Sequence, residues 1–295
     1  MTEPPVLAPV VQGDPVEIEQ GVHVIGDGGV PLVPNIAVVV GARAALVVDT
    51  GMGARNGGFV FEHAAALAGQ RRLLLTLTHF HPEHGFGAQA FAGAAAIVYN
   101  REQRDELRQK GQAYLEMFRT FGDHIAGELE GVELVEPDVV YEEKADVELG
   151  GTTAELRACG LGHTRGDQIV HLPNERILIT GDLAENGLFP IFPYFPPEDV
   201  DIDGGRWIEV LERLERLEPR IVVPGHGPIG DAGILARTRE CLAALRTETR
   251  LRRQEGHPLD DTVVELDLEF RARYPGWQQP EWIGFAVRSF YDSDS

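Results

Sequence analysis

The sequence predicts an α/β fold in which two β-rich halves lie face to face and helices cover the outside. Both halves contain short apolar stretches bounded by glycine, and both contain an amphipathic helix. Each half also has a buried strand that runs directly into a histidine-containing loop. The two halves resemble each other in the order of their elements alone, because no repeat of residues is visible between them.

The first half begins with strands and continues with alternating strands and helices. Residues 16–50 contain three strands, VEIEQGVHVIG, NIAVVVG and AALVVDTG, with glycine-containing turns between them. Helical spacing over 59–67 is followed by the buried strand RRLLLTLTHF, which delivers HPEHG to a loop. After the strand AAAIVYN, a polar helix begins at Arg101. The apolar side of that helix is formed by Leu107, Tyr114, Leu115 and Phe118.

The second half repeats this order after Val132. Strands are predicted at 138–141, 145–149, 154–158, 168–172 and 176–180, because glycine, asparagine or charged turns separate these apolar pieces. The helix GGRWIEVLERLERLE then leads to the short buried strand in RIVVPGHGP. The apolar stripe of this helix consists of Trp207, Ile208, Leu211, Leu214 and Leu217.

Three further helices are predicted at the C-terminal end, in ILARTRECLAALRTETRLRRQ, DDTVVELDLEFRARY and EWIGFAVRSFY. We therefore expect three parts: a flexible N-terminal segment (1–15), a main domain (16–228) and a helical extension (229–295). The extension is expected to pack on the main domain, because helices of about 30 residues cannot bury a core alone. The sequence leaves two other roles of these helices undecided, namely a lid and a homodimer surface.

Composition excludes several classes of protein. The 295 residues are 43% hydrophobic and 25% charged, which is typical of a folded chain and not of a disordered one. The net charge of −21 disfavours nucleic acid and anionic membranes as partners, although a small basic pocket is compatible with it. Without a membrane-length apolar run or a signal segment, a cytoplasmic protein is expected. Cys159, in or near a strand, and Cys241, on a helix face, are expected to be reduced.

Side chains that can bind metal follow apolar strands at five places. A strand end fixes the backbone while the following loop exposes the side chain, which suits a binding site. These side chains are Asp49 in LVVDTG, the cluster His79, His81, Glu83 and His84 in THFHPEH, His163 in GHTRGD, Asp182 in ITGD and His226 in PGHG.

Imidazole and carboxylate ligands together suit Zn²⁺, with manganese and iron as competitors. A merely solvated histidine-rich loop is disfavoured, because five of the ten histidines fall in three glycine-flanked loops at strand ends. The other five are interpreted as ordinary strand, helix or loop residues: His23, His63, His124, His171 and His257.

At these motifs the sequence resembles the metallo-β-lactamase-fold hydrolases, whose pattern is HxHxDH followed by a lone His, a lone Asp and a final His. THFHPEH, GHTRGD, ITGD and PGHG occur in the family order, with DTG before them, over residues 16–227. The resemblance implies an αββα sandwich of two mixed β-sheets flanked by helices. One departure is that Glu83 stands where the family usually has Asp.

The resemblance also implies a ligand set and a reaction. His79, His81 and His163 would hold one metal ion, His84, His226 and Glu83 a second, and Asp182 would bridge the two. Two zinc ions would activate a water to a metal-bound hydroxide that attacks a carbonyl or phosphoryl group. Glu83, which is one methylene longer than Asp, either substitutes with a small backbone shift or weakens the second site.

Other residues near these motifs are candidates for supporting roles. Asp49 either hydrogen-bonds the histidine loop and orients an imidazole, or only caps the turn at Thr50 and Gly51. Thr164 and Asp167 are expected to orient the His163 loop. Arg165 is either a surface residue or a contact for a substrate carboxylate.

The segment GLFPIFPYFPPED after Asp182 contains four aromatic residues spaced by prolines, so it cannot be a helix. Its aromatic side chains either seal the core or form one wall of an apolar substrate pocket. They are Phe189, Phe192, Tyr194 and Phe195.

The favoured function is hydrolysis of a small ester, lactone, thioester or amide, with β-lactam opening as a side activity. Phosphodiester cleavage is disfavoured by the net charge, and a secreted β-lactamase by the missing signal segment. The alternative is a mononuclear iron persulfide or thiol dioxygenase on the same fold. A flavodiiron protein lacks its flavodoxin domain here, and a metal-binding scaffold without activity is disfavoured by the complete ligand set.

Overall fold

The computed structural model describes residues 8–293. Of the N-terminal segment predicted over 1–15, residues 1–7 lie outside the described part. Within the rest of that segment Val11 is buried, and its backbone N–H donates to the Asn56 side chain at 2.8 Å. Asn56 also donates to the Pro9 carbonyl. At least this part of the segment is therefore tied to the folded chain.

The described chain divides into two compact units. One consists of residues 8–158 and 168–175, and the other of 159–167 and 176–293. We call them the first and the second unit.

The first unit contains a seven-stranded sheet in which the strands follow one another in chain order. The strands β1 to β4 are antiparallel neighbours, whereas β4, β5, β6 and β7 run parallel. Helix-containing crossovers connect these parallel strands, and every residue of β4 is buried. The strands are β1 (Val16–Glu19), β2 (Val22–Ile25), β3 (Ile36–Val40), β4 (Ala44–Val48), β5 (Arg72–Thr76), β6 (Ala96–Asn100) and β7 (Val139–Tyr141).

The single strand predicted over 16–26 is wrong, because the chain reverses at Gln20 and Gly21 to form the β1–β2 hairpin. Gly21 has φ +76°, which favours glycine, and its carbonyl accepts a hydrogen bond from Val40 N. The sequence alternates on both sides of this turn, so Gly21 is the local sign that the strand is interrupted.

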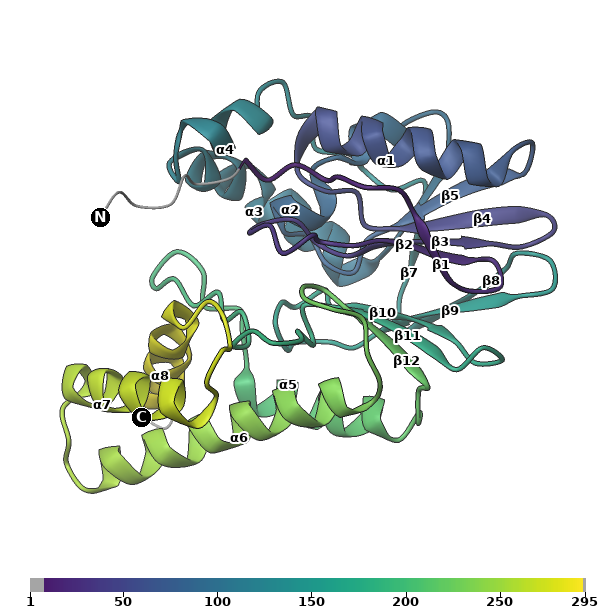
Figure 1. Cartoon of the computed structure of the whole chain (residues 1–295). Coiled ribbons are helices and arrows are strands. Elements are labelled where there is room, and N and C mark those ends of the chain that lie inside the picture. The colour runs from purple at the N-terminus through teal and green to yellow at the C-terminus, as the bar shows by residue number, and fades with distance from the viewer. Residues whose placement is uncertain (1–7, 294–295) are drawn as a thin grey trace. The chain divides into compact units, whose positions relative to one another are not determined.

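Four helices and a short 3-10 helix complete the first unit: α1 (Gly53–Ala68), α2 (Pro82–Gly85), η1 (Ala88–Phe91), α3 (Arg101–Arg119) and α4 (Asp123–Glu128). Helix α1 lies along β3, β4 and β5 (Figure 1). It begins six residues before the predicted helix, in the glycine-rich stretch GARNGG. Glycine is needed there because a Cβ on Gly57 would lie 2.1 Å from the Gly87 carbonyl oxygen. Helix α4 was not predicted.

A five-stranded sheet has the order β12-β11-β10-β9-β8. Strands β8, β9 and β10 are antiparallel, and β11 and β12 are parallel. The strands are β8 (Lys144–Glu148), β9 (Thr153–Ala158), β10 (Gln168–Leu172), β11 (Ile177–Gly181) and β12 (Ile221–Pro224). The predicted strands of the second half are therefore confirmed to within about two residues.

On this sheet, the Glu155 carboxylate of β9 contacts three nitrogen-bearing side chains. Its carboxylate lies 3.0 Å from His171 Nδ1 and 3.2 Å from Lys144 Nζ, and it pairs with Arg157. Partial burial alone would raise the pKa of Glu155, but the hydrogen bonds from these three side chains outweigh it and lower the pKa to about 2.

The second unit contains the helices α5 (Gly204–Glu215), α6 (Gly233–Gln254), α7 (Leu259–Arg273) and α8 (Glu281–Ser293). Helix α6 packs against α5, α7 and α8 (Figure 1). Trp207 of α5 is fully buried and donates from Nε1 to the Leu183 carbonyl at 2.9 Å. The C-terminal helices thus share a core with α5, which precedes the predicted boundary at residue 228.

Within the described residues, neither of the two cysteines forms a disulfide. Cys241 lies on the buried face of α6, and burial, reinforced by the charge of Glu185, raises the pKa of its thiol far above the ordinary value. Cys159 follows β9 directly and is partly exposed. No helix within residues 8–293 is both long and apolar enough to cross a membrane.

Candidate metal centre

The histidine cluster lies where β5 ends and the short helix α2 begins. Pro82 occupies the first turn of α2, and the N–H groups of His84 and Gly85 both donate to the His81 carbonyl. This turn replaces the loop that the sequence predicted. It buries all four candidate ligands of the motif, so that Glu83 is only 4% exposed. A carboxylate buried to this extent needs a compensating cation or hydrogen bonds.

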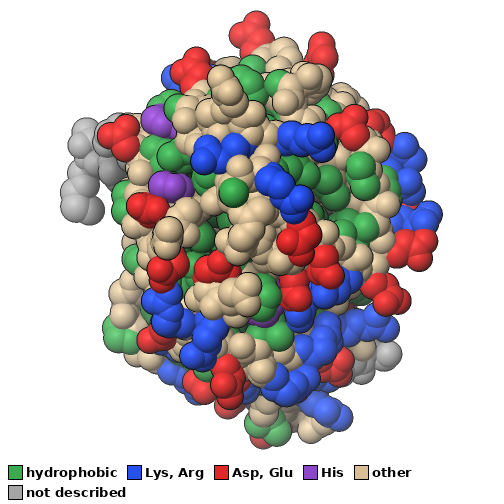
Figure 2. Space-filling model, turned by 90° about the vertical axis from the view of Figure 1, so that its right-hand side faces the viewer, with side chains coloured by type: hydrophobic (Ala, Val, Ile, Leu, Met, Phe, Trp, Pro, Cys, Tyr) green, Lys and Arg blue, Asp and Glu red, His purple; other side chains and the backbone are tan. Residues whose placement is uncertain are grey.

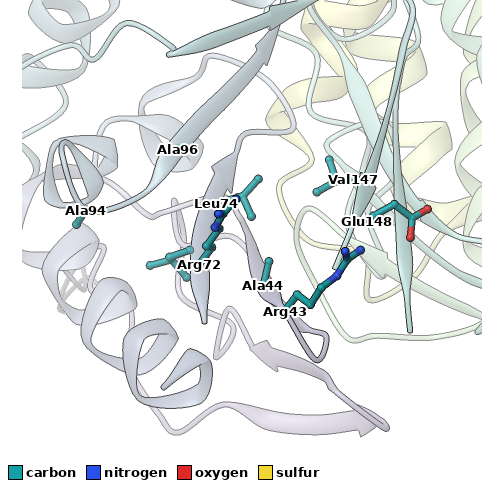
Figure 3. Close-up of a pocket in the computed structure, with 9 residues that line it drawn as sticks. Arg43, Ala44, Arg72, Leu74, Ala94, Ala96, Val147 and Glu148 are labelled. Atoms are coloured by element: carbon teal, nitrogen blue, oxygen red, sulfur yellow. The ribbon is translucent and has the colours of Figure 1, made fainter. Parts of the chain in front are cut away.

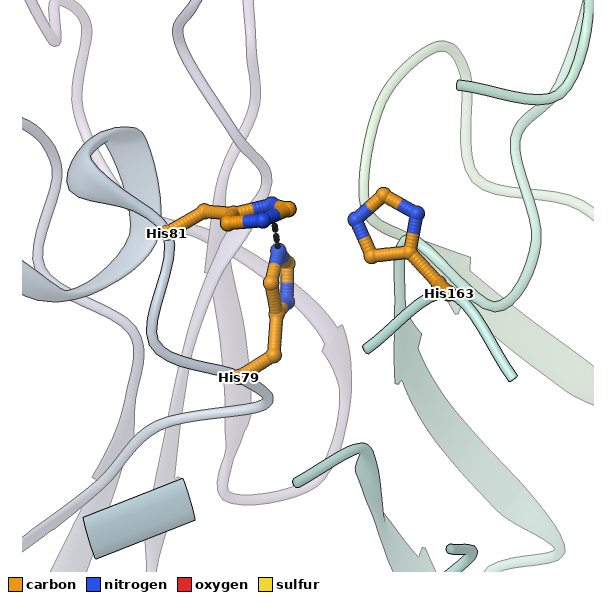
Figure 4. A group of neighbouring side chains, drawn as sticks. All are labelled: His79, His81 and His163. Atoms are coloured by element: carbon orange, nitrogen blue, oxygen red, sulfur yellow. Dashed lines mark hydrogen bonds between the residues drawn. The ribbon is translucent and has the colours of Figure 1, made fainter. Parts of the chain in front are cut away.

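The rings of His79 and His81 meet edge to face (Figure 4). His79 directs Nδ1 toward the Thr78 hydroxyl at 3.1 Å, and its Nε2 lies 3.0 Å from His81 Nδ1. Two nitrogens bound to one tetrahedral zinc ion, each at about 2.0–2.1 Å, would be about 3.3 Å apart. The observed separation of the two nitrogens is close to what a shared zinc ion requires.

Asp49 holds this cluster from the end of β4. Its Oδ1 accepts from Thr78 N at 2.7 Å, and its Oδ2 accepts from the Thr78 hydroxyl at 2.9 Å. Oδ2 also lies 2.9 Å from His84 Nδ1. A carboxylate at this distance keeps the proton on Nδ1 and leaves Nε2 of His84 as the ligand atom. The interpretation that Asp49 only caps the turn at Thr50 and Gly51 is therefore wrong, since its carboxylate is directed at Thr78 and His84.

In the second unit, Asp167 organises the loop that carries His163. One carboxylate oxygen accepts from His163 N at 2.7 Å, and the other accepts from Thr164 N and the Thr164 hydroxyl. His163 directs Nδ1 toward the Ile191 carbonyl at 2.9 Å, and Trp207 packs edge-on against its ring. These contacts leave Nε2 of His163 as the atom available to a metal ion.

Asp182 follows β11 and faces two histidines of the same unit. Its Oδ2 is 3.7 Å from His163 Nε2, and its Oδ1 is 3.6 Å from His226 Nε2. A side chain at Gly225 would prevent this arrangement, because a Cβ there would lie 1.9 Å from Asp182 Oδ1. The two carboxylate oxygens are thus directed at different histidines, as a bridging ligand requires.

Among the described residues, the seven predicted ligands are all buried. In the first unit, His79, His81, Glu83 and His84 follow β5 within one short stretch, and in the second unit Asp182 faces both His163 and His226. The resemblance divides these ligands into two groups, which are His79, His81 and His163, and Glu83, His84, Asp182 and His226. Three imidazoles, and two imidazoles with two carboxylates, are donor sets that suit zinc and other borderline divalent ions.

Comparison with known families agrees with this arrangement. A family model described as the Metallo-beta-lactamase superfamily matches residues 29–226, about two thirds of the chain. The chain belongs to this superfamily. Its HxHxEH motif, with Glu83 at the fifth position, is a variant of the pattern that the sequence resembled.

Among curated proteins, this superfamily member is similar to the acyl-coenzyme A thioesterase MBLAC2. The human protein is 28% identical over 211 residues, which span 65% of this chain and 72% of the relative. The chicken (Gallus gallus) protein is 28% identical over 206 residues, with the same shares covered.

Among solved structures, a metallo-beta-lactamase from Pontibacter korlensis has a TM-score of 0.63 at 20% identity. The match covers 79% of this chain and 99% of that one. The sec-alkylsulfatase Pisa1 from Pseudomonas sp. has a TM-score of 0.70 at 16% identity and covers 95% of this chain and 50% of that one. Both comparisons show the fold, which confirms the predicted sandwich of two mixed sheets with flanking helices.

In this superfamily member, the residues predicted to line a substrate pocket are divided between core and surface. Phe189 and Phe192 are buried in the second unit, where Phe189 packs against Trp277 and Phe192 against Trp207. These two residues therefore seal the core, which was one of the two alternatives that the sequence left open. Three residues are more exposed: Tyr194 bonds to Asp292, Phe195 packs on Trp282 and Phe285, and Arg165 lies 3.8 Å from Asp201.

Sequence reasoning missed two side chains that support the histidine cluster. Thr78 connects Asp49 to His79 through one hydroxyl, and Tyr114 of α3 stacks on the His81 ring at 5.2 Å. The helical spacing of Tyr114 indicated only that it would be buried. For Thr78, the only sign in the sequence of a supporting role was that a polar residue directly precedes the first histidine of the motif.

Proposed function

We propose that this chain is a dinuclear zinc hydrolase that cleaves a small thioester, with esters, lactones and amides as weaker substrates and β-lactams as a side activity. The observation that carries the proposal is the geometry of Asp182. Its two oxygens face His163 of one ligand group and His226 of the other. A family match, a thioesterase relative and two ligand groups together support a metal-dependent hydrolase.

The ligands would divide as the two groups do. His79, His81 and His163 would hold one ion, and Glu83, His84 and His226 the other, with Asp182 between them. When bound, two such ions supply an activated water and polarise the oxygen of the group under attack.

The other residues of the site position these ligands. Asp49 fixes the ring of His84, and Asp167 fixes the backbone that presents His163. The burial of all seven ligands excludes bulk water, which strengthens electrostatic interactions within the site.

A thioester is favoured over the other carbonyl substrates by the curated relatives. The thioesterase aligns with this chain at 28% identity over 211 residues, whereas the solved lactamase is 20% identical and shows the fold alone. A thioester also has a good leaving group, so its cleavage needs less assistance to the departing atom than cleavage of an amide.

The dioxygenase alternative would use one iron ion held by His79, His81 and His163. It gives no role to the second group, in which both carboxylates and both histidines are buried. Four buried ionisable groups without a cation would be costly, which favours two ions. The second group therefore favours the hydrolase over the dioxygenase.

The decisive experiment measures metal content and substrate preference on the same protein. The chain would be purified without chelator, its metals quantified, and hydrolysis followed with matched pairs of thioester and oxygen ester that share one acyl group. We expect close to two zinc ions per chain and faster cleavage of the thioester. Asp182→Asn should lose activity, whereas Asp146→Asn, an exposed change on β8, should not.

One tightly held iron ion per chain, together with no zinc-dependent hydrolysis after reconstitution, would overturn the proposal in favour of a dioxygenase. If the chain binds two zinc ions and cleaves oxygen esters but not thioesters, the proposed hydrolase activity is supported and the proposed thioester substrate is rejected.

We also propose a small molecule as the partner, and neither nucleic acid nor membrane. The net charge of −21 supports this, and acidic and basic side chains are interspersed on the face drawn in Figure 2. A cytoplasmic location and a homodimer formed through the C-terminal helices are proposals as well. Size-exclusion chromatography with light scattering tests the second of these.

A further inference from the structure

A groove opens in the first unit at the amino ends of its parallel strands (Figure 3). Its volume is about 930 Å³, which is within the range of roughly 300–1,000 Å³ typical of small-molecule sites. We call it the amino-edge groove. It is lined by Arg43 and Ala44 at the start of β4, Arg72, Leu73 and Leu74 of β5, Ala94 and Ala96 around the start of β6, and Val147 and Glu148 of β8.

The amino-edge groove is separate from the candidate metal centre. The ligand residues of this unit follow the carboxyl end of β5, whereas the groove lies at the opposite end of the same strand. The five residues of β5 extend about 16 Å at roughly 3.3 Å per residue. Active sites of parallel sheets lie beyond the carboxyl ends of the strands, so this groove is not part of the hydrolytic site.

Two arginines dominate the charge of the groove. Arg72 N donates to the Arg43 carbonyl at 3.3 Å, so that the two residues are neighbours on adjacent strands. Within residues 8–293, neither guanidinium forms an ion pair or a side-chain hydrogen bond. Other arginines of this unit do form such pairs, among them Arg55 with Glu128 and Arg108 with Glu136. In a chain of net charge −21, two neighbouring unpaired cations stand out.

The rest of the lining is mostly apolar and small. Three alanines leave the space open, and Leu73, Leu74 and Val147 are only half-buried. The one acidic side chain, Glu148, accepts a hydrogen bond from the Thr153 hydroxyl at 2.8 Å, and the Arg43 side chain extends toward it (Figure 3). The groove thus combines a hydrocarbon surface with two cations.

We propose that the amino-edge groove binds an alkyl carboxylate, with the chain along the apolar lining and the carboxylate between Arg43 and Arg72. Guanidinium groups bind carboxylates through paired, charge-assisted hydrogen bonds, and alkyl groups gain free energy by leaving water. Charge complementarity selects an anion over a neutral alcohol. The proposal concerns binding alone and does not rest on the hydrolase function.

The test measures decanoate binding to the metal-loaded protein by calorimetry, with decanol and decylammonium as uncharged and cationic comparisons. We expect saturable binding of decanoate and weaker binding of the other two. The double change Arg43→Gln and Arg72→Gln should weaken decanoate binding by at least about tenfold, because two charged hydrogen-bond donors are lost. Arg101→Gln, which removes a surface pair with Glu142 in the same unit, is the matched control and should have no effect.

The variant Glu148→Gln should change the affinity for decanoate in the opposite direction. It removes a carboxylate near Arg43 and keeps an acceptor for Thr153, so decanoate should bind more tightly. The location is tested with a photoactivatable decanoate analogue followed by peptide mapping. Label on the segments 43–44, 72–74 or 94–96 is the expected result.

No saturable binding, or binding that the double variant leaves unchanged, would overturn the proposal. Label confined to the peptides that carry the metal ligands would do so as well, because decanoate would then bind at the metal centre. A failed hydrolase assay leaves these outcomes unaffected, so the two proposals fail independently.

Discussion

Replacement of Asp49 by asparagine should weaken the second metal site while the fold persists. Asp49 has φ +70°, a left-handed conformation that asparagine tolerates and most other residues do not. The amide oxygen can still accept from Thr78 N, which now bonds to Oδ1 at 2.7 Å. The amide nitrogen would then take the position of Oδ2 and face His84 Nδ1.

Two N–H groups cannot face each other, so His84 would move its proton from Nδ1 to Nε2. That tautomer presents N–H to the metal instead of a lone pair. Loss of such an orienting partner typically reduces metal affinity by about 10–100-fold. This range corresponds to about 1.4–2.8 kcal/mol for the second ion. The first ion, on His79, His81 and His163, should be affected much less.

The assay is a competition titration against a chromogenic zinc chelator, with bound zinc counted after dialysis and the urea unfolding of metal-free protein measured in parallel. Asp146→Asn, an exposed change of the same chemistry, is the control. The reasoning is refuted if zinc affinity stays unchanged while the metal-free protein loses stability. Asp49 would then support only the fold.

Further predictions follow from the other residues of the site and from two titratable groups. Glu83→Asp should tighten the second site and Glu83→Gln should loosen it by about 10–100-fold in chelator titrations; no change in either variant would place Glu83 outside the coordination sphere. His81→Ala and His163→Ala should each abolish turnover while far-UV circular dichroism stays largely unchanged; loss of that signal would indicate a structural site. Because the pKa of Glu155 is lowered to about 2, its contribution to stability is present above its ordinary pKa of 4.5 and is lost as the pH falls toward 2. Urea unfolding of Glu155→Gln should therefore show less loss of stability on acidification than the wild type, and equal losses would contradict the assignment. Cys241 should resist a thiol reagent until the protein unfolds, because burial raises the pKa of its thiol; rapid modification in the native protein would contradict this.

The sequence by itself determined the candidate ligand set and its position at strand ends. Apolar runs such as RRLLLTLTHF and RIVVPGHGP show where strands end, and the spacing of the histidines after them is local information. Most strands and helices could be predicted for the same reason, whereas the two mixed sheets were expected from the resemblance to the metallo-β-lactamase fold. Glycine misled the prediction at α1, because GARNGG suggests a loop until the close approach of Gly57 to the Gly87 backbone is known.

Only the tertiary structure decided how these residues act on one another. It showed that Asp49 bonds to Thr78 and His84 and does not cap its own turn, and that each oxygen of Asp182 faces a different histidine. It also placed Phe189 and Phe192 in a core and brought Arg43 beside Arg72, with neither guanidinium in an ion pair within the described residues. These relations join residues that are distant along the chain. Strand pairing and packing create them, and local sequence patterns carry no record of which long-range neighbour a side chain will meet.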